Sequence, residues 1–154
     1  MSVSKPTIII VPGAWHAPSS YDKLAEELKA ANFTALIASH PSLNSKDPKS
    51  VSCTQDTAAV RSILLPLLDK GEDVVLVAHS YGGVSASGAA HGLSKVSRAK
   101  AGKESGVLGI VYIAGFLIPT GLNMDGMIGP PPYLIPNQVS DAFSFSHFPS
   151  LIFG

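Results

Sequence analysis

An apolar run ends directly at a serine that is followed by two glycines, and this junction constrains the fold more than any other part of the chain. Val74–Val77 has the composition of a buried strand, and Ala78-His79-Ser80-Tyr81-Gly82-Gly83 follows without an intervening loop. Small residues stand two positions before and after Ser80, at Ala78 and Gly82. A strand can turn at once into a helix only where these neighbours are small, so the pattern predicts a sharp strand-to-helix turn with Ser80 at its tip.

A serine in such a turn is compatible with a purely structural role, and the surrounding pattern is what favours a functional one. A helix of small residues is expected after Ser80, and a second glycine-containing loop, Pro12-Gly13-Ala14-Trp15-His16, follows another apolar run. A serine hydroxyl is a weak nucleophile until a base accepts its proton and hydrogen-bond donors stabilise the oxyanion that it forms. Two loops at the ends of neighbouring strands can supply those donors, so we favour a catalytic interpretation of Ser80.

Strand-like and helix-like segments alternate along the chain as far as Ala114. Runs of β-branched and apolar residues predict strands at residues 7–11, 33–38, 74–79 and 107–114. Apolar residues at helical spacing predict a helix that begins at Ser19 or Ser20, a second at residues 54–69 with a kink at Pro66, and a third at residues 82–91. This alternation implies the α/β fold class, a parallel, right-handed sheet covered by helices on both faces.

Two polar segments predict connections rather than helices. Residues 39–52 are rich in Ser, Pro, Asn and Lys and are expected to form a loop. The segment from Lys95 to Lys103 carries four basic residues, including Arg98, and is expected to be a solvated surface connector.

The composition fits one buried core and excludes several classes of partner. Of the 154 residues, 45% are hydrophobic and 14% are charged, as in a sheet that is buried on both faces. Eleven basic and eleven acidic side chains cancel, so we expect neither nucleic acid nor an anionic membrane as a partner.

Two features of the sequence predict a cytoplasmic protein. Cys53 is the single cysteine and cannot form an internal disulfide. The apolar run at residues 8–11 is too short for a signal or membrane segment. We place the core in residues 1–120, and the start of a cap with an irregular apolar tail in residues 121–154.

Residues 7–24 (TIIIVPGAWHAPSSYDKL) and residues 75–84 (VLVAHSYGGV) resemble the α/β-hydrolase superfamily. Within it they are most similar to the branch of small esterases that contains plant methyl esterases and hydroxynitrile lyases. The resemblance covers residues 1–120 and implies a parallel, doubly wound α/β-hydrolase core, with the C-terminal strands of that core missing from this chain. It further implies a serine hydrolase that acts on the ester, or a related acyl bond, of a small apolar molecule in small-molecule metabolism.

The resemblance also assigns roles to individual residues. Ser80 corresponds to the nucleophile, and the backbone amides of Ala14 and Tyr81 correspond to the oxyanion hole. His79 corresponds to a histidine that packs beneath the turn and does not act as the base. The resemblance places three residues in the pocket wall: Gly13, Trp15 and His16.

In this family the acid and the catalytic histidine follow the serine in the chain, each after a later strand. Asp125 and His147 follow Ser80 in that order, so a role as acid and base stays open for them. Asp141 is too close to His147 for the two to end successive strands. We interpret these residues as solvated acids and a tail histidine, which leaves the triad incomplete.

Three hypotheses therefore remain open. The chain is a hydrolase that completes its site with tail residues or a partner chain, a catalytically impaired binding protein that keeps the pocket, or a truncated pseudo-enzyme. No His, Cys, Asp or Glu pair has metal-ligand spacing and no G-x-G-x-x-G motif follows a strand, so we expect neither a metal nor a cofactor.

The strand expected at residues 107–114 is apolar throughout, and in the family it lies between two neighbours. Here its outer neighbour is missing, which leaves unpaired backbone groups beside apolar side chains. We therefore predict a homodimer through this sheet edge, or aggregation.

Overall fold

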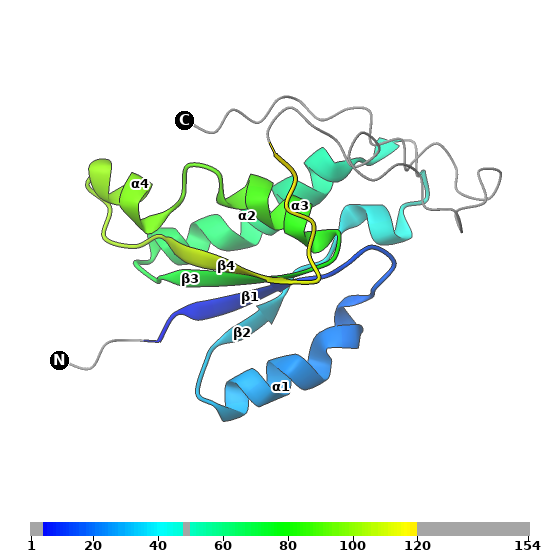
Figure 1. Cartoon of the computed structure of the whole chain (residues 1–154), viewed down its shortest axis with the longest axis horizontal. Helices are drawn as coiled ribbons and strands as arrows, with labels where there is room; N and C mark the ends of the chain where they lie inside the picture. Colours follow the sequence, from blue (N-terminus) through cyan, green and yellow to red (C-terminus); the bar gives the residue numbers. More distant parts are fainter. Residues whose placement is uncertain (1–4, 48–49, 120–154) are drawn as a thin grey trace.

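Residues 5–47 and 50–119 are described by the computed structural model, and they contain one four-stranded sheet (Figure 1). Its strands are β1 (Thr7–Val11), β2 (Ala35–Ile37), β3 (Val74–His79) and β4 (Val107–Ile113). They lie in the order β2-β1-β3-β4, and every neighbouring pair is parallel. This arrangement confirms the predicted α/β class. The predictions for residues 121–154, including Asp125 and His147, lie outside the described residues.

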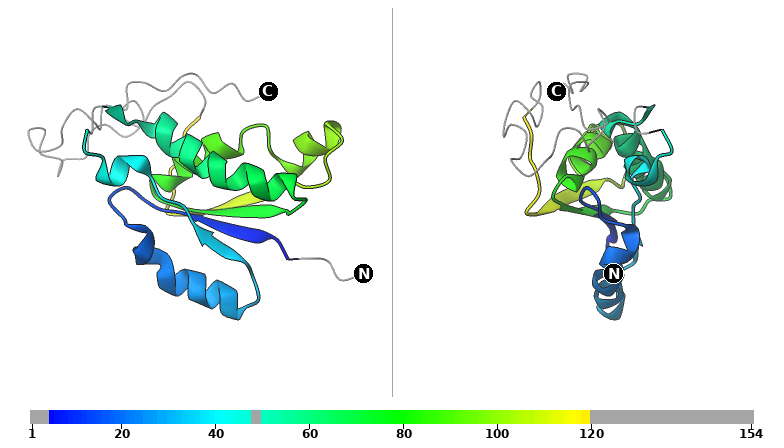
Figure 2. Two further views of the ribbon diagram at one scale, coloured as in Figure 1. Left: turned by 180° about the vertical axis from the view of Figure 1, so that it is seen from behind. Right: turned by 90° about the vertical axis from the view of Figure 1, so that its right-hand side faces the viewer.

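Helices cover both faces of the sheet. Helix α1 (Asp22–Ala30) packs on one face, and helices α2 (Cys53–Asp69) and α3 (Gly82–Ala90) pack on the other (Figure 2). Helix α2 begins with a capping box in which Ser52 and Gln55 exchange side-chain and backbone hydrogen bonds, and it continues past Pro66 to Asp69.

The alternation of side chains along β1 divides the core between the two faces. Ile9 and Val11 join the cluster formed with α2 and α3, whereas Ile8 and Ile10 join the cluster that contains Ala25 of α1. All five residues of β1 are buried. Because neighbouring side chains of a strand point to opposite faces, a strand covered on both sides needs an unbroken apolar run, and this explains the sequence of β1.

Several predicted boundaries and connections are wrong. Strand β2 is shorter than the predicted 33–38, and the helix expected from Ser19 or Ser20 begins as the 3-10 helix η1 (Pro18–Tyr21) before α1 starts. The loop predicted at residues 39–52 contains a second 3-10 helix, η2 (Pro41–Asn44). The connector predicted after Lys95 is instead a short helix, α4 (Lys95–Lys100), which Ser94 caps at its N-terminus.

The interpretation of Arg98 as a solvated residue is also wrong. Its side chain is buried, and it donates hydrogen bonds to the backbone oxygens of Ser105 and Leu68. A further contact of 3.2 Å reaches the carboxylate of Asp69. Because the last carbonyl groups of a helix lack intrahelical donors, the guanidinium satisfies the C-terminal turn of α2 and favours the helix dipole there.

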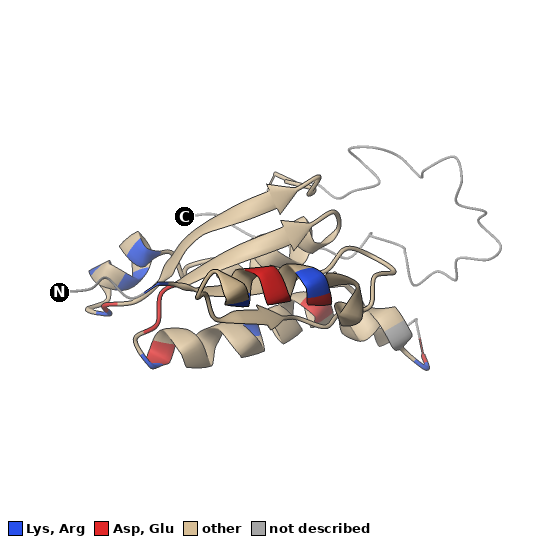
Figure 3. Cartoon of the chain, turned by 90° about the horizontal axis from the view of Figure 1, so that it is seen from below, with Lys and Arg blue, Asp and Glu red and all other residues tan. Residues whose placement is uncertain are grey.

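The described part of the molecule has no concentrated charge near the carboxyl ends of the strands. Helix α1 carries both signs of charge, and the basic residues of α4 lie at the opposite end of the sheet (Figure 3). Within residues 5–47 and 50–119, no helix is long and apolar enough to span a lipid bilayer.

Strand β4 is an edge of the sheet, since no other described strand pairs with its outer side. Three of its apolar side chains are about half exposed: Leu108 (50%), Val111 (52%) and Ile113 (45%). An open edge with exposed apolar side chains promotes pairing with another chain.

Self-association through β4 can be tested by introducing a charged side chain into this strand. We expect the purified chain to elute from size-exclusion chromatography as a dimer or larger, and Val111→Lys to shift it toward the monomer, because a charged edge opposes strand pairing. Val96→Lys is the matched control, since Val96 is 68% exposed but lies on α4. A monomeric wild-type chain would contradict the prediction.

Candidate active site

Ser80 occupies the sharp turn between β3, which ends at His79, and α3, which begins at Gly82. Its φ of 49° lies in the left-handed region, where a residue with a side chain is strained by roughly 1–3 kcal/mol. Hydrogen bonds on both sides hold this conformation: the Ser80 amide donates to Ile113 O at 3.1 Å, and the Phe116 amide donates to Ser80 O at 3.0 Å. The predicted strand-to-helix turn is therefore confirmed, with a strained backbone at its tip.

Glycines allow the first turn of α3 to approach other backbone segments closely. A Cβ atom at Gly82 would lie 2.5 Å from Pro12 O and closer still to Val11 O, and one at Gly83 would lie 2.5 Å from Phe116 O. Carbonyl oxygens of the backbone cannot move aside as a flexible side chain can. The small residue predicted two positions after Ser80 is thus required by the contact of Gly82 with the backbone at the end of β1.

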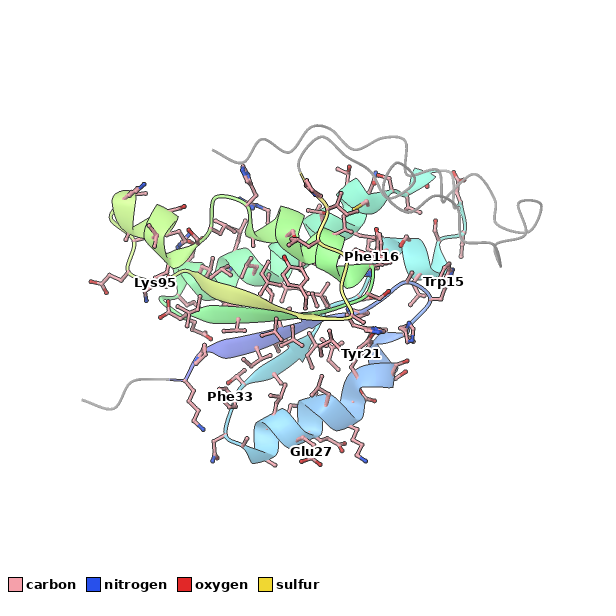
Figure 4. The ribbon with its side chains drawn as sticks, in the orientation of Figure 1. Trp15, Tyr21, Glu27, Phe33, Lys95 and Phe116 are labelled. Atoms are coloured by element: carbon pink, nitrogen blue, oxygen red, sulfur yellow. The ribbon has the colours of Figure 1, made fainter. Side chains whose placement is uncertain are left out.

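The loop after β1 lies directly beside the turn. Gly13 is buried, and a Cβ atom there would lie 3.2 Å from the Cβ of Ser80. The chain reverses over the next residues, with the His16 amide donating to Gly13 O and Trp15 at a φ of 62°. Trp15 and His16 are exposed at the carboxyl end of the strands, the end where Phe116 also lies (Figure 4). The structure thus brings Ser80 and the predicted oxyanion loop together.

Tyr21 joins this loop to the turn, a role that the sequence analysis did not assign to it. Its hydroxyl accepts a hydrogen bond from the Gly13 amide at 2.9 Å and lies 2.7 Å from His79 Nδ1. The His16 ring packs edge-on against His79 with centroids 5.2 Å apart. In the sequence, Tyr21 is only one of the apolar residues at helical spacing that predict the helix after Ser19 or Ser20, and this spacing carries no information about its hydroxyl.

A buried polar network holds Tyr81 from the opposite face of the sheet. The Tyr81 hydroxyl donates to the carboxylate of Asp56 at 2.7 Å, and the Ser42 amide and hydroxyl also donate to this carboxylate. His40 packs against the Tyr81 ring, and its Nε2 lies 2.9 Å from Ser85 Oγ. Asp56 is fully buried in the first turn of α2, where the helix dipole favours a negative charge.

Burial controls the ionisation of the groups around Asp56. Desolvation lowers the pKa of His40, although the Asp56 charge acts in the opposite direction. Desolvation also raises the pKa of the Cys53 thiol and of the Tyr81 hydroxyl, and the nearby Asp56 charge adds to both shifts. The network therefore contains a neutral imidazole, a neutral phenol and a neutral thiol at neutral pH.

Three of the four histidines in the described segments have hydrogen-bond partners other than the Ser80 hydroxyl, and the fourth, His91, follows the far end of α3. His79 is bonded to Tyr21, His40 to Ser85, and His16 to the backbone oxygen of Ala14. Asp125 and His147 lie outside the described residues. In those same segments, no group of three or more His, Cys, Asp or Glu side chains is arranged to hold a metal ion.

Comparisons with known proteins agree on one family. The sequence model of the alpha/beta hydrolase family matches residues 8–152. The alpha/beta hydrolase nvfD of Aspergillus novofumigatus is 36% identical over 126 residues, which is 82% of this chain and 49% of that protein. The carbendazim hydrolyzing esterase of a Nocardioides species is 26% identical over 136 residues, which is 88% of this chain and 51% of that one. The chain thus spans about half the length of these relatives.

A solved structure shows the same fold. It is an extracellular alpha/beta-hydrolase from a Paenibacillus species, described as sharing structural and functional homology with tobacco salicylic acid binding protein 2. It matches with a TM-score of 0.60 and 19% identity, over 77% of this chain and 44% of the other. These matches confirm the resemblance drawn from residues 7–24 and 75–84.

The close approach at Gly82 predicts a large effect of a single methyl group. We expect Gly82→Ala to lower the free energy of unfolding by at least about 1–3 kcal/mol, because the carbonyls of Val11 and Pro12 must shift. Gly109→Ala is the matched control, since a Cβ at Gly109 would meet nothing within 4 Å. Urea unfolding of both variants measures the difference, and equal midpoints would contradict the close approach.

The buried state of His40 predicts a pH dependence of stability. In the unfolded chain His40 regains its ordinary pKa of 6.5 and takes up a proton below that pH, whereas the folded state keeps it neutral. The free energy of unfolding should therefore decrease as the pH falls from 6.5 toward the lower, folded-state pKa of His40. His40→Gln should show a shallower decrease than the wild type in urea unfolding between about pH 7.5 and about pH 5. Identical slopes for His40→Gln and the wild type would exclude His40 as the cause.

Proposed function

This chain belongs to the alpha/beta hydrolase family, and on that basis we propose that it is a serine hydrolase in which Ser80 attacks the carbonyl carbon of a small, apolar ester. The observation that carries this proposal is the strained, left-handed backbone conformation of Ser80 directly after β3. The buried Gly13 of the loop after β1 lies beside it. Strain of this kind is retained where the surrounding structure enforces it, and a catalytic nucleophile is a common reason for it.

In the proposed reaction, Ser80 Oγ forms a bond to the carbonyl carbon and transfers its proton to a base. The carbonyl oxygen becomes an oxyanion, which the amide groups of Ala14 and Tyr81 would stabilise. Tyr81 directly precedes α3, whose N-terminal dipole adds positive potential. Collapse of the tetrahedral intermediate releases the alcohol, and water then hydrolyses the acyl-enzyme.

The proposed substrate is a small molecule with an ester or related acyl bond. We assign the pocket wall to Gly13, Trp15 and His16, which belong to the loop beside Ser80. One relative is named as an esterase, which supports this bond type. We further propose that the protein acts in the cytoplasm without a cofactor, and that residues 1–120 form its core and residues 121–154 the start of a cap and a tail.

The base and the acid are the open part of this proposal. Asp125 and His147 are our candidates within the chain, because they follow Ser80 in the family's order. A partner chain is the other source. The second candidate function is a catalytically impaired binding protein, and it is favoured because His16, His40 and His79 all bond to groups other than the Ser80 hydroxyl.

Ser80→Ala separates these two functions. We expect the wild-type chain to react with a fluorophosphonate probe and to hydrolyse short p-nitrophenyl esters weakly, because oxyanion stabilisation alone accelerates hydrolysis by roughly 10³-fold over water. Ser80→Ala should abolish probe labelling, while Ser62→Ala on the exposed side of α2 should not change it. Absence of labelling from the wild type would favour the binding protein, and labelling that persists in Ser80→Ala would exclude Ser80 as the nucleophile.

Robust turnover would instead show that the triad is complete. A kcat of about 10 s⁻¹, the value of an average enzyme, requires an efficient base. Asp125→Ala and His147→Ala should then each lower kcat by orders of magnitude if these residues are the acid and the base.

A further inference from the structure

The hydroxyl of Tyr21 lies between the two segments that carry the proposed oxyanion donors. On one side it accepts the Gly13 amide at 2.9 Å, and on the other it lies 2.7 Å from Nδ1 of His79, the residue before Ser80. Tyr21 is 8 residues from Gly13 in the chain but 58 residues from His79, so the contact with the turn is long-range. It ends η1, and Figure 4 shows its ring between α1 and the carboxyl end of the sheet.

One arrangement of the protons uses every donor in this hydrogen-bond chain, and it runs from Gly13 through Tyr21 to His79. A backbone amide can only donate, so the Tyr21 oxygen accepts from Gly13 and keeps its own proton to donate. Of the acceptors in the described segments, His79 Nδ1 is the one within hydrogen-bond distance of that hydroxyl. When the hydroxyl donates to Nδ1, this nitrogen carries no proton and the ring proton of His79 lies on Nε2, the tautomer that the proposal assigns to His79.

The Gly13 amide needs this acceptor. Gly13 is buried and lies beyond the last paired residue of β1, Val11, so the sheet provides no partner for its amide. A buried amide without an acceptor is costly, and the loop would have to move to satisfy it. Gly13 directly precedes Ala14, so its orientation sets that of the proposed oxyanion donor.

We propose that Tyr21 is a positioning residue that clamps the Gly13 loop to the turn at Ser80 and holds His79 in its Nε2-protonated form. The clamp leaves His79 unable to accept the Ser80 proton at Nδ1, which agrees with its expected place beneath the turn. The effect of this clamp on catalysis rests on the proposed function, whereas the hydrogen bonds that form the clamp are independent of that function. The clamp acts through the loop, and Tyr21 itself does not touch the reacting atoms.

The geometry is tested by NMR without any activity. At mildly alkaline pH, the ¹⁵N shifts of His79 in the wild-type chain should show a protonated Nε2 and an unprotonated Nδ1. In Tyr21→Phe, which removes only the hydroxyl, the exchange of the Gly13 amide with solvent should accelerate by about tenfold or more, since the amide loses its acceptor. Tyr112→Phe is the matched control, because it removes a hydroxyl that bonds Ser87 Oγ on another helix.

A protonated Nδ1 in the wild type, or a Gly13 exchange rate equal in Tyr21→Phe and Tyr112→Phe, would overturn the clamp. If Tyr21→Phe does not fold, the wild-type tautomer decides alone. The catalytic effect is read from the rate of fluorophosphonate labelling, which should fall by about tenfold to a hundredfold in Tyr21→Phe and stay near wild type in Tyr112→Phe. If the wild type is not labelled, the proposed function fails while the NMR result still decides the clamp.

Discussion

The close approach of α3 to the backbone after β1 is the contact on which the candidate site depends. Helix α3 can begin immediately after Ser80 only because Gly82 has no side chain to meet Val11 O and Pro12 O. That contact places the loop at Gly13 beside the turn at Ser80. A longer connection between β3 and α3 would relax the strain at Ser80 and separate the two segments.

Polar contacts on both faces of the sheet hold this turn in place. On the α1 side, Tyr21 bonds the Gly13 amide and His79. On the other side, the buried Asp56 bonds Tyr81 and Ser42. Ser80 lies between His79 and Tyr81, so the residues before and after it are each tied to a helix by a side chain. These two hydrogen bonds, buried at Tyr81 and partly buried at His79, oppose a rotation of either neighbour that would relax the strained φ of Ser80.

The polar networks on the two faces of the sheet differ in how deeply they are buried. Around Asp56 the polar groups are buried among α2, α3 and η2, and desolvation keeps the neighbouring imidazole, phenol and thiol neutral. Around Tyr21 the groups are only partly buried and lie next to the exposed Trp15 and His16. The first network is therefore suited to stability, and the second lies beside the residues that we propose as the pocket wall.

Local sequence determined the strands, the order of the elements and the turn at Ser80, because backbone conformation follows from apolar periodicity and from small residues at fixed spacing. It did not reveal α4, since short polar helices depend on caps such as Ser94 more than on an apolar face. Only the tertiary structure decided the roles of Arg98, Asp56 and Tyr21. Their hydrogen bonds join residues that are far apart in the chain, so they depend on how helices pack on the sheet, and no local pattern records that packing.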